Sequence, residues 1–278
     1  MLKTQQYMKV SHELPLCLMH YSTKWNDYEY CLPHLVEAYD QYRIHFQVAR
    51  IHKRFIMMDN GLFEGVKHTQ KDLLSKINLI RPNVFIVPDA WNDSTQTIVN
   101  AKSWMKNNRA KIPDEVELMA VLQGNTLAEL LTTYQTLVDL GYKHIAFNHS
   151  SIAYQEMYPN IDPLKASMYG RMELIRKLVE MKTIVKSNYH HLLGCSLPQE
   201  FMEYKDYKFI KSVDTSNPIL VGAEGKRYTD SGLNWKPKEK LEYYFEKDLS
   251  GQKEDICLFP VPFQQYYLRI DLVLLFYF

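Results

Sequence analysis

Short, continuous apolar runs that end in polar residues constrain the fold of this chain more than any other feature. Seven of these runs alternate with longer amphipathic segments. A continuous apolar run is typical of a strand that is buried on both faces, as in a parallel sheet. The runs are LCLMHY (16–21), FIMMDN (55–60), VFIVPDA (84–90), ELMAVLQG (117–124), HIAFNHSS (144–151), HHLLGCS (190–196) and FIKSVDTS (209–216).

Between the runs, apolar residues recur at helical spacing. Residues 69–81 place four leucines and isoleucines on one face, and residues 126–141 repeat this pattern and end on Gly141 as a C-cap. Residues 93–106 open with cap-type residues. We expect helices in these three segments and also over 164–186 and 197–204.

This alternation predicts an α/β fold, a (β/α)8 TIM-type barrel, rather than an open sheet. The candidate for the eighth unit is ILVGAEG (219–225), followed by a charged helix over 237–249. Without a linker rich in Gly, Ser or Pro, we interpret residues 1–278 as one domain. Its core covers about 15–225, and a C-terminal helix and tail occupy 226–278.

Composition excludes few functions. The net charge of +1 gives no strong field towards nucleic acid, although a local basic patch can still bind phosphates. The four cysteines are far apart, which indicates reduced thiols and a cytoplasmic protein. The apolar tail LRIDLVLLFYF is too short to span a membrane, and we expect no signal peptide in residues 1–13, which are polar and lack an apolar core.

Polar residues follow each strand, where a parallel α/β protein carries its chemistry. Asp59, Asp89 and Asp214 end three of the runs, and Gln123 ends another. Two facing carboxylates suit glycosidic chemistry, in which one attacks the anomeric carbon and the other moves protons. A third carboxylate beside an amide suits recognition of a planar base with N–H donors.

Six motifs, in the order in which they follow one another along the chain, resemble those of the tRNA-guanine transglycosylase superfamily. The resemblance is closest to its DNA-modifying branch, the phage and bacterial 7-deazaguanine DNA transglycosylases. The resemblance covers roughly residues 15–225 and depends on the order of the motifs, since no single motif is specific. The motifs are IMMDNGLFE, VPDAWND, AVLQGNT, IAFNHSS, HLLGCSLPQE and SVDTSNP.

The resemblance implies a pentosyltransferase that exchanges guanine for a 7-deazaguanine. By motif position, Asp214 is the nucleophile that attacks C1′, and Asp59 is the general acid/base. Asp89 and Gln123 read the base edge. The remaining positions that the resemblance assigns to substrate binding are Gly124, Phe147, Asn148, Leu193 and Gly194.

Two departures from the family pattern matter. The family's zinc motif, C-x-C-x-x-C followed by a histidine, does not follow Asp214, where Cys257 stands alone. We therefore expect a barrel without the zinc-binding subdomain, with no metal and no cofactor. The family's double glycine after the first aspartate is reduced to Asn60-Gly61-Leu62, so the shape of the site should differ there.

The expected partners are DNA and a 7-deazaguanine base, with no membrane. The sequence leaves three alternatives open: exchange on tRNA, a non-catalytic nucleic-acid-binding paralogue, and a barrel hydrolase with water as acceptor. It also leaves open whether helper proteins take part. Lys205, Lys208, Lys211, Lys226 and Arg227 flank the Asp214 loop, where they are either solvated or contact phosphates.

Each candidate residue also has a structural interpretation. Asp59 fits a turn, because Asp-Asn-Gly is a strong turn sequence, and Asp214 fits a cap before a helix. Asp93 competes with Asp89 but looks more like the cap of the next helix, and Gln123 could be structural.

Cys195 could be a thiol nucleophile, but no histidine partner is identifiable. His149, His190 and His191 lack the spacing of a metal site.

Overall fold

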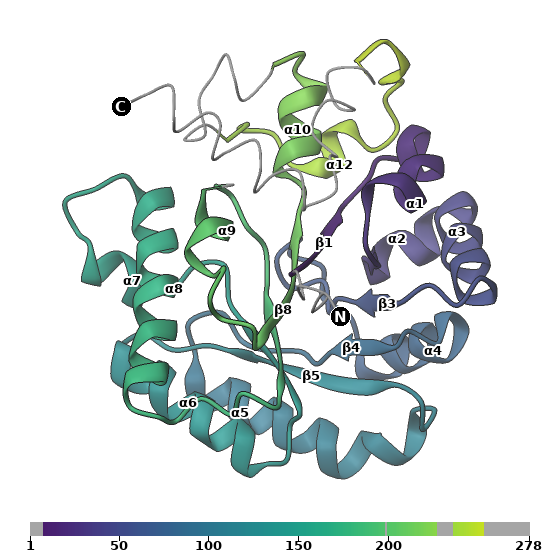
Figure 1. Ribbon diagram of the computed structural model, residues 1–278. Coiled ribbons are helices and arrows are strands. Elements are labelled where there is room, and N and C mark those ends of the chain that lie inside the picture. Colours follow the sequence, from purple (N-terminus) through teal and green to yellow (C-terminus); the bar gives the residue numbers. More distant parts are fainter. Residues whose placement is uncertain (1–7, 198, 227–235, 253–278) are drawn as a thin grey trace, which may run out of the picture. The chain divides into compact units, whose positions relative to one another are not determined.

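A computed structural model describes residues 8–197, 199–226 and 236–252 of the chain. Eight parallel strands form one sheet in the order β1-β8-β7-β6-β5-β4-β3-β2, with helices in the connections (Figure 1). The fold is the predicted (β/α)8 TIM-type barrel.

The strands are short and mostly buried. All residues of β3 and β4 are buried, as are the last five of β5. This confirms the prediction of strands covered on both faces. The strands are β1 Lys9–His12, β2 Glu29–Cys31, β3 Ile56–Met58, β4 Val84–Ile86, β5 Glu117–Leu122, β6 His144–Phe147, β7 Tyr189–Leu192 and β8 Ile210–Thr215.

The helices vary widely in length, and the longest is α8. The α-helices are α1 Ser22–Trp25, α2 Pro33–Ala38, α3 Asp40–Ile51, α4 Gln70–Ile80, α5 Ser94–Ser103, α6 Leu127–Asp139, α7 Ile152–Met157, α8 Pro163–Glu180, α9 Glu200–Glu203, α10 Asn217–Ala223 and α12 Leu241–Tyr244. Short 3₁₀ and π segments are η1 Leu16–Tyr21, η2 Trp104–Asn108, η3 Arg109–Lys111 and η4 Ser250–Gln252.

Helices are confirmed in all five predicted segments between strands, although α8 ends at Glu180 and α9 spans Glu200–Glu203, so both are shorter than predicted. Caps explain where three of the helices begin. The side chains of Thr69, Asp93 and Thr126 each accept a hydrogen bond from the backbone N–H three residues on, at the starts of α4, α5 and α6. Gly141 follows α6 with a φ of +91°, as expected of a C-cap glycine. Asp93 is therefore a helix cap, as predicted.

Two predicted strands are wrong. Residues 16–21 form η1, because Pro15 starts a helical turn in which the Leu18 N–H donates to the Pro15 carbonyl at 2.9 Å. Residues 219–225 fall largely in α10, which begins at Asn217 with Pro218 in its first turn. Two strands of the structure, β1 and β2, were not predicted, because their sequences KVSH and EYC are too short and too polar to resemble apolar runs.

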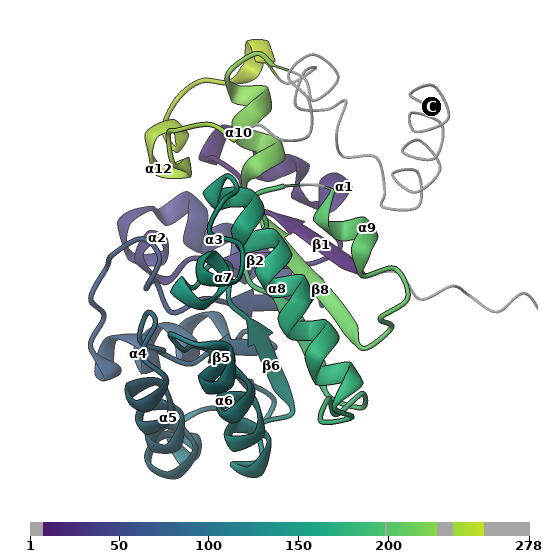
Figure 2. The same cartoon turned by 90° about the vertical axis from the view of Figure 1, so that its left-hand side faces the viewer.

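The chain divides into two compact units, and each contains strands of the barrel sheet. One unit comprises residues 1–28 and 194–278, and the other comprises residues 29–193. In the first unit β1 pairs with β8, with Ser11 opposite Asp214. In the second unit α5 and α6 lie side by side, and α7 lies along α8 (Figure 2).

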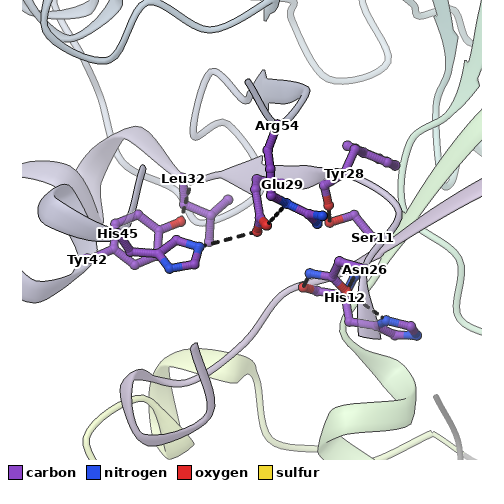
Figure 3. Close-up of polar contacts among 9 residues, drawn as sticks. All are labelled: Ser11, His12, Asn26, Tyr28, Glu29, Leu32, Tyr42, His45 and Arg54. Carbon is purple, nitrogen blue, oxygen red and sulfur yellow. Dashed lines mark hydrogen bonds and ion pairs between the residues drawn. The ribbon is translucent and has the colours of Figure 1, made fainter. Parts of the chain in front are cut away.

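Polar side chains near β1 and β2 explain how such short strands are held (Figure 3). In the first unit, Asn26 hydrogen-bonds the backbone N–H and carbonyl of His12, at 2.8 and 2.9 Å. In the second unit, Glu29 of β2 is buried and pairs with Arg54 at 2.6 Å and His45 at 3.3 Å. Glu29 is therefore anchored through its charge rather than through apolar packing.

The C-terminal region is helical over a shorter stretch than predicted. Of residues 237–249, Leu241–Tyr244 form the α-helix α12. Arg227, Cys257 and the apolar tail at 268–278 lie outside the described residues.

Candidate functional site

The three candidate carboxylates follow or end strands of the sheet, and all three are buried. Asp59 comes directly after β3, Asp89 lies three residues after β4, and Asp214 belongs to the last part of β8. Their exposed fractions are 6%, 8% and 3%. Buried carboxylates need hydrogen-bond partners, and these partners define the surroundings of each aspartate.

Asp89 is the centre of a buried amide–carboxylate cluster in the second unit. Its Oδ2 accepts a hydrogen bond from Gln123 Nε2 at 2.6 Å, and its Oδ1 accepts one from Asn60 Nδ2 at 2.8 Å. Asn60 Nδ2 also donates to the Val87 carbonyl at 3.1 Å. Two neutral amides therefore fix both carboxylate oxygens after β4.

The cluster extends from Gln123 to the end of β6. Gln123 Oε1 accepts hydrogen bonds from the Asn92 N–H at 3.1 Å and from Asn148 Nδ2 at 3.3 Å. Asn148 Oδ1 in turn accepts from the Tyr154 hydroxyl at 2.6 Å. Asp89, Gln123 and Asn148, three of the predicted residues, thus belong to one connected hydrogen-bond network.

Burial governs the ionisation of Asp89. It raises the pKa of the Asp89 carboxyl, and the hydrogen bonds from Gln123 and Asn60 offset this effect only in part. Each carboxylate oxygen can accept more than one hydrogen bond. Asp89 can therefore accept a further N–H donor while the two amides hold its orientation.

Asp59 belongs to a tight turn, in agreement with the structural interpretation of its sequence. Gly61 has a φ of +81°, which glycine adopts without strain. Asn60 Oδ1 accepts from the Leu62 N–H at 2.8 Å, and Asp59 Oδ2 lies 3.4 Å from the Gly61 nitrogen. The Asp59 N–H donates to the Cys31 carbonyl at 2.9 Å. The turn therefore places Asp59 and Asn60 together at the end of β3.

The other predicted residues of the second unit hold the backbone in place. The Leu193 N–H donates to the Phe147 carbonyl at 2.9 Å, and the Gly124 carbonyl accepts from the Ser151 hydroxyl at 2.7 Å. The fully buried Arg171 donates to the Leu193 carbonyl at 3.1 Å. The Phe147 ring packs in the core, with its centroid 5.6 Å from that of His190.

Asp214 has its own support in the first unit. Its Oδ1 accepts a hydrogen bond from the Gly194 N–H at 2.9 Å. The loop that carries Gly194 is tied to the end of β8, because the Thr215 hydroxyl donates to the Cys195 carbonyl and Asn217 Nδ2 to the Ser196 carbonyl, each at 2.6 Å. Gly194 and Asp214, both predicted, are therefore in direct contact.

Cys195 has an acidic neighbour, and Lys236, which donates to the Ser196 hydroxyl at 2.9 Å, interacts with Cys195 through charge. Its Sγ lies 3.4 Å from Glu200 Oε2, and Glu200 also accepts from the Tyr204 hydroxyl at 2.7 Å. A thiol nucleophile is activated by a nearby base or cation, so Lys236 would favour a thiolate and Glu200 would oppose it.

Several members of these clusters were not predicted from sequence. Arg171 had a detectable signal, because it is a charged residue at helical spacing with the buried residues Ser167, Leu174 and Leu178 of α8. Asn92 and Tyr154 had none, since polar residues are ordinary in loops and at helix starts. Their roles depend on tertiary contacts.

The described part of the chain carries neither a metal-ligand cluster nor a membrane-spanning helix. Within residues 8–197, 199–226 and 236–252, no three His, Cys, Asp or Glu side chains are grouped so that they could hold a metal ion. No helix in these ranges is long and apolar enough to cross a membrane. No protein-family model matches the chain, and no curated protein sequence matches it.

Proposed function

We propose that this protein is a base-exchange transglycosylase that replaces guanine in DNA with a 7-deazaguanine. The observation that carries the proposal is the position of Asp59, Asp89 and Asp214, each buried at the C-terminal end of a strand of one parallel barrel sheet. Barrel enzymes carry their catalytic groups at these strand ends. The order of the strand-end motifs, which resembles that of the tRNA-guanine transglycosylases, gives further support.

In the proposed reaction, Asp214 is the nucleophile. A carboxylate oxygen of Asp214 attacks C1′ of the target nucleoside, the bond from C1′ to the base breaks, and the departing guanine takes the electron pair. The hydrogen bond from Gly194 to Asp214 Oδ1 supports this role, because it orients the carboxylate. The product of this step is a glycosyl ester on Asp214.

Asp59 moves the proton in both half-reactions. It protonates the departing guanine, and it then takes a proton from the incoming 7-deazaguanine as the ring nitrogen attacks C1′ and the Asp214 ester bond breaks. Two inversions at C1′ restore the original configuration.

Asp89 and Gln123 bind the base edge. The N–H groups of guanine and of a 7-deazaguanine need acceptors, and Asp89 retains lone pairs beyond those used by Gln123 and Asn60. The target base must leave the duplex stack before these contacts can form, so the substrate is a flipped or single-stranded nucleotide.

Incorporation of a radiolabelled 7-deazaguanine into DNA and into tRNA tests the proposal. We expect incorporation into DNA, a covalent DNA adduct on denaturing gels, and loss of both in Asp214→Asn. Asp206→Asn is the matched control, because Asp206 is exposed in the same unit. Nucleoside analysis of DNA from cells that express the protein together with a 7-deazaguanine pathway covers a requirement for helper proteins.

Other outcomes would replace the proposal with a named alternative. Incorporation into tRNA alone would identify a tRNA-guanine transglycosylase, and release of guanine without incorporation would identify a hydrolase. Full exchange by Asp214→Asn would refute the assignment of the nucleophile. Nucleic-acid binding with neither adduct nor exchange would identify a non-catalytic paralogue.

A further inference from the structure

Lys236 carries a half-buried positive charge beside the loop that contacts Asp214. Its Nζ donates a hydrogen bond to the Ser196 hydroxyl at 2.9 Å. Within residues 8–197, 199–226 and 236–252, this nitrogen forms no ion pair with a carboxylate. A lysine amine is seldom removed from water unless an anion accompanies it, so the Lys236 ammonium group needs a partner.

The charges that face Lys236 come from its own compact unit. Glu13 and Cys195 attract the ammonium group, and Lys240 repels it. Burial lowers the pKa of the Lys236 amine, and the two attractive charges offset this effect only in part. A further anion beside this nitrogen would therefore replace interactions that the ammonium group loses on burial.

The Lys236 ammonium group and the Asp214 carboxylate are held by the same loop. The Gly194 N–H donates to Asp214 Oδ1 at 2.9 Å, and Asn217 Nδ2 donates to the Ser196 carbonyl at 2.6 Å. Ser196 follows Gly194 by two residues, and two residues of extended chain span at most about 7 Å. A ligand that reaches Asp214 therefore comes close to Lys236.

The surroundings of Asp214 are acidic and would repel a phosphate group. Glu200 Oε2 lies 3.4 Å from Cys195 Sγ, in the same loop, and Glu13 faces Lys236. Carboxylates repel a phosphodiester at short range, most strongly where water is excluded. A cation beside Ser196 offsets this repulsion at the place where a nucleotide must approach Asp214.

We propose that Lys236 binds one phosphate group of the DNA strand, next to the nucleoside that Asp214 attacks. An ammonium group has three N–H donors, so two remain beside the one that contacts Ser196. Phosphate contacts carry no base information, but they fix the register of a strand on a protein. The inference rests on the proposed function, and it assigns to Lys236 the positioning of the sugar against Asp214.

The first test measures binding and does not depend on activity. A fluorescent single-stranded oligonucleotide with a single guanosine is titrated with the protein at several salt concentrations. We expect Lys236→Met to weaken binding about 10-fold and to reduce the slope of log Kd against log salt by about 0.7. Lys236→Arg should retain the slope, and so should Lys102→Met, because Lys102 is exposed on α5.

Urea unfolding checks that each variant is folded, and Lys236→Gln replaces Lys236→Met if methionine destabilises the protein. A folded variant that lacks the Lys236 charge and binds with the original slope would overturn the inference. In that case the hydrogen bond to Ser196 only fastens the chain at Lys236 to the loop.

The second test locates the phosphate. A set of oligonucleotides carries one neutral methylphosphonate each, at successive positions on either side of the guanosine. We expect one position at which the neutral group weakens binding by the unsubstituted protein about 10-fold but does not weaken binding by Lys236→Met further. Losses that add to that of Lys236→Met at every position would contradict a direct contact.

The third test separates this inference from the proposed function. In base exchange, Lys236→Met should raise KM for DNA with little change in kcat or in KM for the free base, because the contact is made in the ground state and in the transition state alike. Exchange with an unchanged KM for DNA would contradict the role of Lys236 alone. Binding that depends on Lys236, without any exchange, would contradict the proposed function alone.

Discussion

Gln123 Nε2 donates a hydrogen bond of 2.6 Å to Asp89 Oδ2. Both side chains are buried, and Asn60 donates to the other carboxylate oxygen. The hydrogen-bond partners of Asp89 are therefore neutral amides, whose donors match the acceptors of the carboxylate. This pairing lets a buried acid keep a fixed orientation, although burial raises its pKa.

Replacement of Gln123 by glutamate should make this pairing depend on pH. In Gln123→Glu two carboxyl groups meet at hydrogen-bond distance, and they can remain together only while they share a proton. The shared proton raises the pKa of the pair in the folded state above its value in the unfolded state. The proton therefore stabilises the folded variant at low pH, and this stabilisation is lost as pH rises. We expect a loss of about 3 kcal/mol at pH 8 and little loss at pH 4, measured by urea unfolding.

The chain offers a matched control on its surface. Gln135 Nε2 donates to Asp139 Oδ1 at 2.8 Å on the exposed face of α6. Because solvent screens that pair, Gln135→Glu should change the free energy of unfolding by at most about 0.5 kcal/mol at either pH. Similar losses in the two variants would show that Asp89 is not in a buried cluster.

The sequence predicted the barrel because β3 to β8 carry their signals locally. An apolar run such as FIMM ends in a turn, and a capped amphipathic helix follows. β1 and β2 lack such a signal. Glu29 is buried only because Arg54 and His45 accompany it, and no local pattern predicts a buried ion pair.

The same distinction applies to the candidate site. Asp89 and Gln123 stand at strand ends, so their position could be predicted, and the structure connects them directly. The role of Tyr154 could not be predicted. Tyr154 reaches Asn148 from helix α7. Contacts between different elements carry no periodic signal in the sequence.

The ion pairs of Glu29 should stabilise the protein with a pH dependence opposite to that of Gln123→Glu (Figure 3). Burial opposes its ionisation, but hydrogen bonds and charges from His45 and Arg54 outweigh burial and lower the pKa of the Glu29 carboxyl. The ion pairs therefore contribute stability above the unfolded pKa, and this contribution is lost as pH falls. We expect Glu29→Gln to cost about 3 kcal/mol at pH 7, with a smaller difference from the unsubstituted protein near pH 4.

Glu115 provides the comparison for this ion pair. It lies 3.3 Å from Arg50, and its side chain is 43% exposed. Because exposed pairs contribute about 0–1 kcal/mol, Glu115→Gln should unfold nearly as the unsubstituted protein does. Urea titrations of both variants at pH 4 and pH 7 separate a buried pair from a surface pair, and a loss for Glu29→Gln that is independent of pH would contradict the prediction.

We expect Gly170→Ala to destabilise the protein, although alanine normally stabilises a helix by about 1 kcal/mol relative to glycine. A Cβ at Gly170 would lie 2.3 Å from Tyr154 Cβ and 2.5 Å from Tyr154 Cα. Because part of this obstacle is backbone, α7 and α8 must separate. We expect Gly170→Ala to lose about 1–3 kcal/mol of stability and to disturb the hydrogen bond from Tyr154 to Asn148.

Two further variants separate the clash from the hydrogen bond. Tyr154→Phe keeps the ring and removes the hydroxyl, so it should cost about 1 kcal/mol. Gly251→Ala should be nearly neutral, because nothing lies within 4 Å of its new Cβ. Thermal unfolding ranks the three variants, and a Gly170→Ala protein at least as stable as the unsubstituted one would exclude the close approach of the helices.

The Thr215 hydroxyl helps to hold the loop that lies beside Asp214. Its hydroxyl donates to the Cys195 carbonyl at 2.6 Å, one residue beyond the Gly194 N–H that binds Asp214. Thr215→Val keeps the side-chain volume but leaves that carbonyl without its donor, so we expect a loss of about 1–2 kcal/mol and slower formation of the Asp214 adduct. Thr136→Val removes a similar bond, to the Thr132 carbonyl at 2.9 Å on the exposed face of α6, and should change neither quantity. If both variants formed the adduct at the original rate, the Gly194 hydrogen bond would not depend on this anchor.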